Sequence, residues 1–276
     1  MSSTRVLSIL LVVGLTSYAA PGAWATIYLA LDADFEGKPV NQPIGTGGAA
    51  VGEPVEIVQS TDAIVRDTPM PSRCLEMSDI DEYFAGGAAF EFLDSAEYTT
   101  GLVKIEMDLW FEELEDYFVY VREQGTAAQT FANIRFSGGG IVVAEDADTT
   151  PGQVVGTYEA DRVVPIVIQF DLDKGVWHLT LDGMRVLADE PHGVTERGVG
   201  QVIIGVSHDE DLDGKVNLDN LLVTWNDSPP ACGAVPGIPK PADGGYILPL
   251  GLALCVIALG GVVMRWSAKP ASRDAF

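Results

Sequence analysis

The sequence is short of cysteine, histidine and basic residues, and each shortage excludes a class of protein. Three cysteines and three histidines in 276 residues are too few for a disulfide-dense scaffold or a multi-cysteine zinc module. The 16 Lys and Arg residues stand against 40 Asp and Glu residues, which gives a formal net charge of −24. Nucleic acid and anionic lipid are therefore excluded as partners. With 47% hydrophobic residues, the chain is expected to fold around one core.

Helical periodicity is also missing before residue 246. Short runs that alternate apolar and polar residues recur there at intervals of roughly ten residues, as in proteins built from strands. The clearest example places Trp177, Leu179 and Leu181 on one side of a strand, followed by an Asp182-Gly183 pair that is typical of a two-residue type I′ turn. The pattern predicts an all-β fold, a two-sheet antiparallel sandwich over residues 26–227.

Two long apolar runs lie near the ends of the chain. The first follows Arg5 and ends before Ala-Trp-Ala at 23–25, which is the pattern of a secretory signal peptide over residues 1–25. The second, residues 246–264, carries no charge and as a helix would cover about 28 Å, enough for a transmembrane helix. We expect an exported protein with a single membrane anchor in the cell envelope.

The flanks of the second run set the expected orientation. Residues 265–276 form a short basic tail, which places the C-terminus in the cytoplasm and residues 26–240 outside. Residues 228–245 are rich in Pro and Gly and read as an extended spacer between domain and membrane. The oligomeric state is left open by the sequence.

Three motifs resemble those of a known family. Asp-Phe-Glu-Gly at 34–37, the hairpin at 177–183 and the last strand at 216–223 look like parts of a concanavalin A-like (laminin-G-like) jelly roll. That family includes sugar-binding modules, adhesive domains, glycoside hydrolases and polysaccharide lyases. The resemblance therefore implies a fold and a set of functions that all involve glycans or surfaces.

The C-terminal tail resembles a second group. A short Pro-containing motif, one span and a few basic residues are similar to the sorting tails of exosortase-processed envelope proteins of Gram-negative-type bacteria. This resemblance implies a sorting protease as a partner. Pro239-Lys240-Pro241 stands where such tails usually carry Pro-Glu-Pro, and a permanent anchor is the alternative.

One strand comes close to a catalytic motif. Hydrolases of the resembled superfamily often carry Glu-x-Asp-x-Glu, whereas here Glu106 and Asp108 are followed by Trp110 in the place of the second Glu. Alternation puts these three residues and Glu112 on one face. Carboxylates four residues apart on a strand are about 13 Å apart, far from the roughly 5 to 5.5 Å of a retaining pair. No catalytic residue is assigned on this basis.

The leading prediction is accordingly a carbohydrate-binding or adhesive surface domain without catalysis. A polysaccharide-active enzyme, either glycoside hydrolase or lyase, is the first alternative, and a structural cell-envelope protein is the second. The sequence leaves open whether the chain is an enzyme and favours a non-enzyme. The aromatic residues nominated to bind a glycan are Trp110, Tyr120 and Tyr158.

Calcium is the cofactor that the sequence indicates. Asp209, Asp211 and Asp213 precede a Gly in an Asp-x-Asp-x-Asp-Gly run, which resembles the opening of a calcium loop, with Asn217 or a nearby carbonyl completing the shell. The twelfth position is Asn220 rather than Glu, and an acidic turn without metal is the alternative. The resemblance to the jelly roll implies a second set, Asp34, Glu36 and Asp219, because some members hold calcium between their first and last strands.

A disulfide between Cys74 and Cys232 is also expected. Both cysteines lie in the exported part of the chain, where an oxidising compartment favours disulfides. Two free thiols remain the alternative, since sequence does not show the distance between the two Cα atoms.

Overall fold

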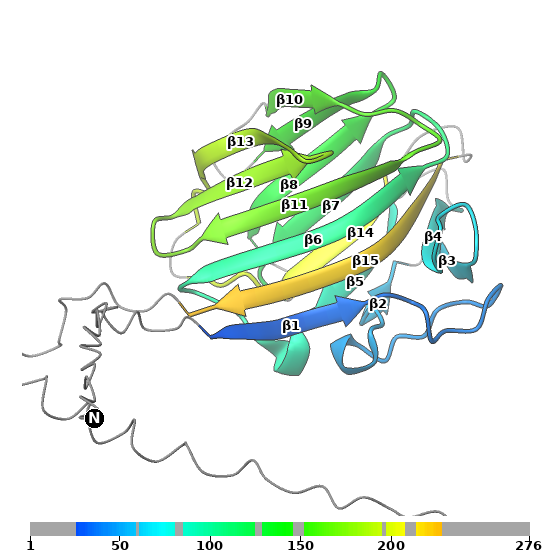
Figure 1. Ribbon diagram of the computed structural model, residues 1–276, viewed down its shortest axis with the longest axis horizontal. Coiled ribbons are helices and arrows are strands. Elements are labelled where there is room, and N and C mark those ends of the chain that lie inside the picture. Colours follow the sequence, from blue (N-terminus) through cyan, green and yellow to red (C-terminus); the bar gives the residue numbers. More distant parts are fainter. Residues whose placement is uncertain are drawn as a thin grey trace, which may run out of the picture. The chain divides into compact units, whose positions relative to one another are not determined.

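The structure is a computed structural model, and it describes residues 26–227 except 59–60, 81–84, 125–128, 146–151, 195–196 and 208–213. These residues form two antiparallel sheets that pack face to face (Figure 1). The predicted all-β, two-sheet fold is confirmed. The predicted signal peptide, spacer, membrane span and tail lie outside the described residues. Within the described residues, no helix is long and apolar enough to cross a membrane.

The first sheet has eight strands in the order β13-β12-β11-β6-β15-β4-β3, with β1 also paired to β15. Its strands, in chain order, are β1 (Ile27–Ala33), β3 (Thr61–Arg66), β4 (Cys74–Asp79), β6 (Leu102–Phe111), β11 (Val163–Asp171), β12 (Val176–Leu181), β13 (Met184–Pro191) and β15 (Lys215–Asn226).

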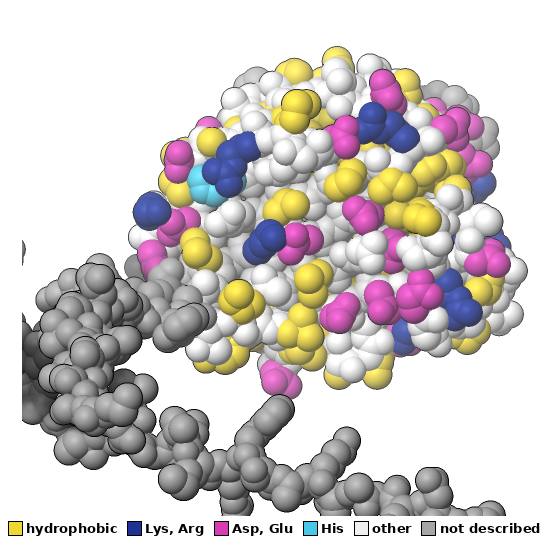
Figure 2. Space-filling view, viewed as in Figure 1, with side chains coloured by type: hydrophobic (Ala, Val, Ile, Leu, Met, Phe, Trp, Pro, Cys, Tyr) yellow, Lys and Arg dark blue, Asp and Glu magenta, His cyan; other side chains and the backbone are white. Residues whose placement is uncertain are grey.

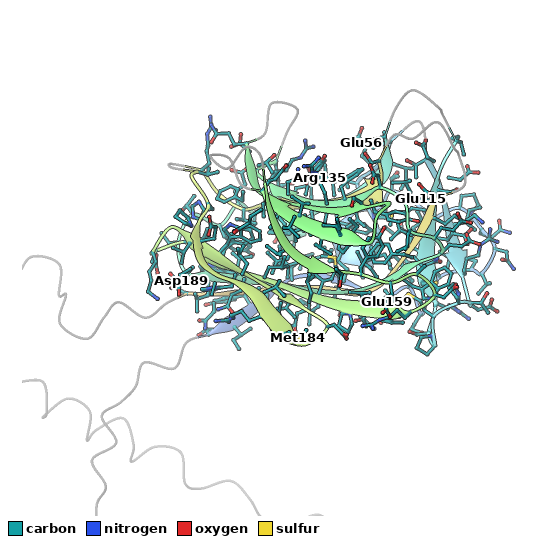
Figure 3. The ribbon with its side chains drawn as sticks, turned by 90° about the horizontal axis from the view of Figure 1, so that it is seen from above. Glu56, Glu115, Arg135, Glu159, Met184 and Asp189 are labelled. Carbon is teal, nitrogen blue, oxygen red and sulfur yellow. The ribbon has the colours of Figure 1, made fainter. Side chains whose placement is uncertain are left out.

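The second sheet has seven strands in the order β10-β9-β8-β7-β14-β5-β2. Its strands, in chain order, are β2 (Glu56–Ile57), β5 (Gly86–Glu91), β7 (Tyr117–Arg122), β8 (Thr130–Ser137), β9 (Ile141–Glu145), β10 (Gln153–Thr157) and β14 (Gln201–Val206). Seen from above, Arg135 and Glu56 lie on the outer side of this sheet, and Met184 lies on the side of the eight-stranded sheet (Figure 3). Two short 3-10 segments, Ala49–Val51 and Leu93–Ser95, complete the described elements.

The core lies between the two sheets and follows from strand alternation. Along β6, every second residue is buried, from Val103 to Phe111, and the residues between them face outward. Phe111 packs against the rings of Tyr117, Phe136 and Tyr158 at centroid distances of 4.8 to 4.9 Å. Burying each side chain of this size contributes about 1.5 to 3 kcal/mol to the free energy of unfolding.

The predicted hairpin turn is also confirmed. Asp182 and Gly183 both have positive φ, 50° and 76°, and Leu181 pairs with Met184 across the turn. A type I′ turn requires this conformation at both central positions, and Asp and Gly tolerate it better than other residues.

The last strand, β15, joins the parts of the eight-stranded sheet. Its first residues pair with β4 and its last residues pair with β1, while its other edge follows β6 over most of its length. The ladder with β6 is interrupted once: three steps of β15, from Asp219 to Leu222, lie against two steps of β6, from Asp108 to Glu106. The extra residue is a β-bulge, and it lies where β15 changes partner from β4 to β1.

Candidate functional site

The outer face of the eight-stranded sheet carries most of the residues that the sequence singled out. Glu106, Asp108 and Trp110 face outward on β6, as alternation predicts. Figure 2 shows this face, with Asp and Glu side chains gathered over β1 and the segment that follows it. A groove of about 420 Å³ lies there. Its lining combines four carboxylates, one amide and an apolar floor: Asp32, Asp34, Glu106, Asp108, Asn220, Met107, Pro165, Ile166, Val167 and Leu222.

Asn220 holds Asp108 in this groove. Its Nδ2 donates a hydrogen bond of 2.9 Å to Asp108 Oδ2. Asn220 occupies the bulge of β15 with φ of 53°, a left-handed conformation that is uncommon for residues other than Gly. Bulges and left-handed residues often mark functional sites, because they redirect a side chain that a regular strand would place elsewhere.

Asp219 lies directly opposite Asp108 on the neighbouring strand. It is buried, its carboxylate accepts a hydrogen bond from Ser72 Oγ, and its Oδ1 accepts one of 2.7 Å from the backbone N–H of Asn220. Burial raises the pKa of Asp219, and the charges of Asp108 and Glu36 add to this, while the bonds from Ser72 and Asn220 act in the opposite direction. Asp108 in the groove therefore has a buried carboxyl group opposite it on β15, and the pKa of that group is raised above its ordinary value.

Glu106 is the second carboxylate of the groove on β6. It pairs with Lys104 Nζ at 2.7 Å, and it precedes Asp108 by two residues on the same face. Two residues along a strand correspond to about 6.8 Å. This is the spacing of the two Cα atoms; the two carboxyl groups of inverting glycosidases are roughly 6.5 to 9.5 Å apart, which leaves space for a water molecule.

The second predicted calcium set comes from neighbouring strands of the eight-stranded sheet. Asp34 and Glu36 follow β1, which pairs with β15, so the first and last strands are neighbours as expected. Glu36 Oε1 accepts a hydrogen bond from the backbone N–H of Arg73, and Asp34 Oδ1 accepts one from the backbone N–H of Glu36. Across the described residues, no group of three or more His, Cys, Asp or Glu side chains is placed to hold a metal ion. Calcium binding by Asp34, Glu36 and Asp219 stays a prediction.

Other predictions fall partly outside the described residues. Asp209, Asp211 and Asp213 lie there, whereas Asn217 is buried on β15. Cys232 also lies outside, so the disulfide stays a prediction. Cys74 is buried on β4, where its Sγ lies 3.4 Å from Asn217 Oδ1, and burial raises the pKa of its thiol to about 11.

The three nominated aromatic residues do not share a surface. Trp110 is half-buried on the outer face of the eight-stranded sheet. Tyr120 lies on the outer face of the other sheet, stacked on Phe118 at 4.5 Å. Tyr158 is buried in the core, and its hydroxyl donates a 2.6 Å bond to the carbonyl oxygen of Glu115.

Sequence reasoning missed Asn220 and the pairing of Asp108 with Asp219. The cross-strand pair depends on register, which short strands do not reveal. A weak signal was present, because Asn is the residue after Gly that most readily takes a left-handed conformation.

No protein-family model matches the sequence, and no curated protein matches it either. Solved structures do match. A chain named sialidase superposes with a TM-score of 0.52 at 10% identity, over 71% of this chain and 18% of that chain. A structure titled as a conserved carbohydrate esterase from the Shiga toxin-encoding bacteriophage phi24B superposes with a TM-score of 0.50 at 9% identity, over 73% of this chain and all of that chain. At these identities the likeness shows a shared fold.

These structures correct the leading functional prediction. The sequence favours a binding or adhesive domain without catalysis, but the proteins of similar fold are named for enzymes that act on carbohydrates. That prediction is therefore wrong in its main form, and the neighbours agree better with its alternative, a glycan-active enzyme. The sequence does not reveal this likeness, because its identity to these structures is only 9 to 10%.

Proposed function

We propose that this chain hydrolyses glycans in the groove of the eight-stranded sheet, with Asp108 and Glu106 as its two catalytic carboxylates. The observation that carries the proposal is the position of Asp108, held by a left-handed Asn220 and placed opposite a buried Asp219. Two carboxyl groups that flank the scissile bond supply the acid and the base of most glycosidases. The names of the two structural neighbours support the substrate class.

In this proposal Asp108 is the general acid and Glu106 is the general base. Asp108, held in place by the side chain of Asn220, donates its proton to the leaving-group oxygen. Glu106, paired with Lys104, activates a water on the opposite side of the bond. The spacing of about 6.8 Å along the strand suits this arrangement, and the product should have inverted anomeric configuration.

The proposal also includes the fold family of the sandwich and the cellular location of the chain. The sandwich is taken as a concanavalin A-like jelly roll, exported through residues 1–25 and anchored by residues 246–264 in the cell envelope. In this location the groove is exposed to glycans outside the cytoplasm. The motifs at 34–37 and 216–223, together with the pairing of β1 with β15, support the jelly-roll assignment.

The proposal is tested by activity of the full-length chain. Release of reducing ends is measured on a panel of β-glucans and galactans, with alginate as the anionic member. We expect turnover of at least one substrate, and a loss of about 10² to 10⁴ in kcat in Asp108→Asn and Glu106→Gln. Asp62→Asn, an exposed carboxylate on β3 of the same sheet, is the matched control and should keep full activity. Absence of turnover on every member, or full activity in both variants, would show that the groove is not an active site.

A further inference from the structure

A second pocket continues the groove along β6. It has a volume of about 370 Å³ and is lined by Trp110 from β6, Glu112 just after β6, Arg66 and Glu76 from β3 and β4, and Asn41, Asp67, Thr68 and Pro69 from loops. Trp110 follows Asp108 by two residues on the same face of the strand. Asp108 in the groove and Trp110 in the second pocket are thus consecutive outward-facing residues, about 6.8 Å apart along the strand.

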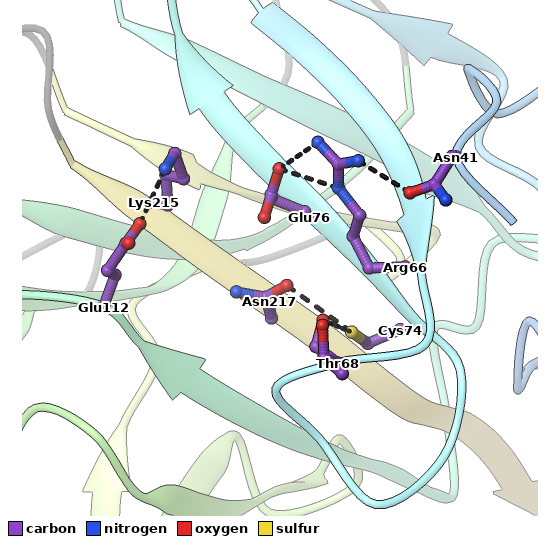
Figure 4. A network of polar contacts seen from close by, with 8 residues as sticks. All are labelled: Asn41, Arg66, Thr68, Cys74, Glu76, Glu112, Lys215 and Asn217. Carbon is purple, nitrogen blue, oxygen red and sulfur yellow. Dashed lines mark hydrogen bonds and ion pairs between the residues drawn. The ribbon is translucent and has the colours of Figure 1, made fainter.

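The polar side chains of this pocket are already held in place. Arg66 donates from Nε and Nη2 to Glu76 Oε1, at 3.0 and 2.9 Å, and from Nη1 to Asn41 Oδ1 at 2.8 Å (Figure 4). Lys215 pairs with Glu112 at 2.9 Å on the opposite side. A site whose side chains are fixed before a ligand arrives loses little conformational freedom on binding.

One buried donor between Trp110 and Glu76 has no acceptor. Asn217 pairs with both residues across the sheet and is fully buried. Its Oδ1 faces Cys74, whereas its Nδ2 points toward the side on which Glu112 lies (Figure 4) and has no hydrogen-bond partner among the described residues. Buried amide groups are nearly always paired, but this nitrogen is fully buried and Asn217 is not among the residues that line the pocket, so it does not contact a ligand there.

The chemistry of the pocket indicates its ligand. An aromatic ring with carboxylate, guanidinium and amide groups around it fits a sugar, which presents C–H groups on its faces and hydroxyl groups at its rim. The charged lining has one Arg against Asp67, Glu76 and Glu112, and the neighbouring groove carries four more carboxylates. These charges disfavour an anionic sugar, because like charges in a partly dry groove repel.

We infer that the Trp110 pocket is a subsite for a neutral sugar residue adjacent to the bond cleaved at Asp108, so that the substrate is a neutral glycan chain that runs along β6. The inference rests on the proposed function for the position of the cleaved bond. The inference adds to the proposed function the subsite, its binding residue and the charge of the substrate. Trp110 stacks on the sugar, and Glu76 and Glu112 accept hydrogen bonds from its hydroxyl groups.

Titration calorimetry on the full-length Asp108→Asn chain tests this without turnover of the ligand. The probes are cellohexaose, laminarihexaose and β-1,4-galactohexaose, the disaccharide of each, and an alginate hexasaccharide. We expect one neutral hexasaccharide to bind more tightly than its disaccharide and than the alginate probe. Adding Trp110→Ala should weaken its binding at least about tenfold. Trp110→Phe, which keeps a ring, should retain part of the affinity, and Tyr28→Ala, an exposed aromatic side chain at the start of β1, should retain all of it.

The outcomes separate this inference from the proposed function. Failure of every neutral hexasaccharide to bind, tighter binding of alginate, or unchanged affinity in Trp110→Ala overturns the subsite. Binding that depends on Trp110 in a chain whose native form shows no turnover supports the subsite and contradicts the hydrolase. Turnover of the hexasaccharide by the native chain, with an unchanged KM in Trp110→Ala, supports the hydrolase and contradicts the subsite. Thermal melting of each variant checks that it is folded, and Trp110→Phe keeps the test valid where Trp110→Ala does not fold.

Discussion

Asn220 is the residue on which the geometry of the candidate site depends. It combines a left-handed backbone at the bulge of β15 with a hydrogen bond from its side chain to Asp108. Left-handed residues other than Gly raise the energy of the folded state by about 1 to 3 kcal/mol. Asn adopts this conformation more readily than most other residues, and here its side chain is oriented toward a carboxylate.

Replacing Asn220 with Gly separates these two effects. Gly adopts positive φ without strain, so Asn220→Gly should unfold at an equal or higher temperature than the native chain. The same change removes the amide that orients Asp108, so kcat should fall by about tenfold or more while KM changes little. Thermal melting and kinetics on the substrate found in the panel measure both quantities. A variant with unchanged kcat would show that Asn220 has no positioning role.

Asp219 should make stability depend on pH. Its pKa in the folded state is raised above the ordinary value, mainly by burial, so the folded state binds its proton more tightly than the unfolded state. The stability that this group contributes is present at pH below its unfolded pKa, and it is lost as the pH rises through the folded pKa.

Asp219→Asn removes that titration. The melting temperature of Asp219→Asn minus that of the native chain should be larger at pH 7 than at pH 4. Ser72→Ala, which removes a donor that lowers the pKa of Asp219, should enlarge the native chain's loss of stability between these two pH values. An equal difference between Asp219→Asn and the native chain at both pH values would contradict this account.

Residue-level predictions succeeded where they depended on alternation alone. Glu106, Asp108 and Trp110 face outward together, as a period of two requires. The predictions were less informative where they depended on contacts across strands. Tyr158 has an aromatic side chain of the kind found in glycan sites, but its ring packs among Phe111, Tyr117 and Phe136, and nothing in the local sequence distinguishes that environment from a surface.

At the scale of elements, β14 is the strand that the local pattern explains least. The sequence shows alternation at Val202, Ile204 and Val206, but all six residues of the strand are buried. Ile203 faces the outer side of the seven-stranded sheet and is covered by a small apolar cluster with Ala89 and Phe118. A second buried face depends on side chains from β5 and β7, which are distant in the sequence.

Gly205 allows β14 and β5 to approach closely. It lies opposite Gly87, and a Cβ atom at Gly205 would lie 1.9 Å from the carbonyl oxygen of Gly86 and 2.6 Å from the Cα of Gly87. Backbone atoms in a central pair of strands do not move aside without breaking the ladder. Gly205→Ala should therefore lower the free energy of unfolding by more than about 3 kcal/mol.

Gly37→Ala is the matched control for this prediction. No atom lies within 4 Å of a Cβ built at Gly37, so the change should stay within about 0.5 kcal/mol of the native chain. Urea unfolding measures both variants. Equal stability of the two would contradict the described packing of β14 against β5.

At the scale of the whole molecule, the dominant feature is its acidity. A net charge of −24 raises the energy of the compact state through self-repulsion. Cations that bind the folded chain should therefore stabilise it, either by general screening or at a specific site.

Calcium distinguishes these two cases. If Asp209, Asp211 and Asp213 hold calcium, a concentration of a hundred times the dissociation constant adds about 2.7 kcal/mol, or roughly 5 to 10 °C in melting temperature. Magnesium at equal ionic strength should give a smaller shift, and Asp211→Asn and Asp213→Asn should lose the calcium response. Equal shifts with both metals, or an unchanged response in the variants, would show that the loop is an acidic turn without a calcium site.

The class of the fold followed from the sequence, whereas the function did not. Alternation, turn residues and the absence of helical periodicity are local signals, and together they predict two antiparallel sheets. The groove depends on the point where the pairing partner of β15 changes from β4 to β1, and on the bulge at that point. Such long-range features are set by the packing of the whole sandwich.

Proton NMR of a hydrolysis reaction tests the central claim most directly. The full-length chain is mixed with the glycan that it cleaves, and the anomeric signals of the first product are followed alongside the same reaction with Asp108→Asn. The account predicts a product of inverted configuration from the native chain, and release at least about a hundredfold slower from the variant. A retained configuration, equal rates from the two chains, or no release from any glycan of the panel would contradict it.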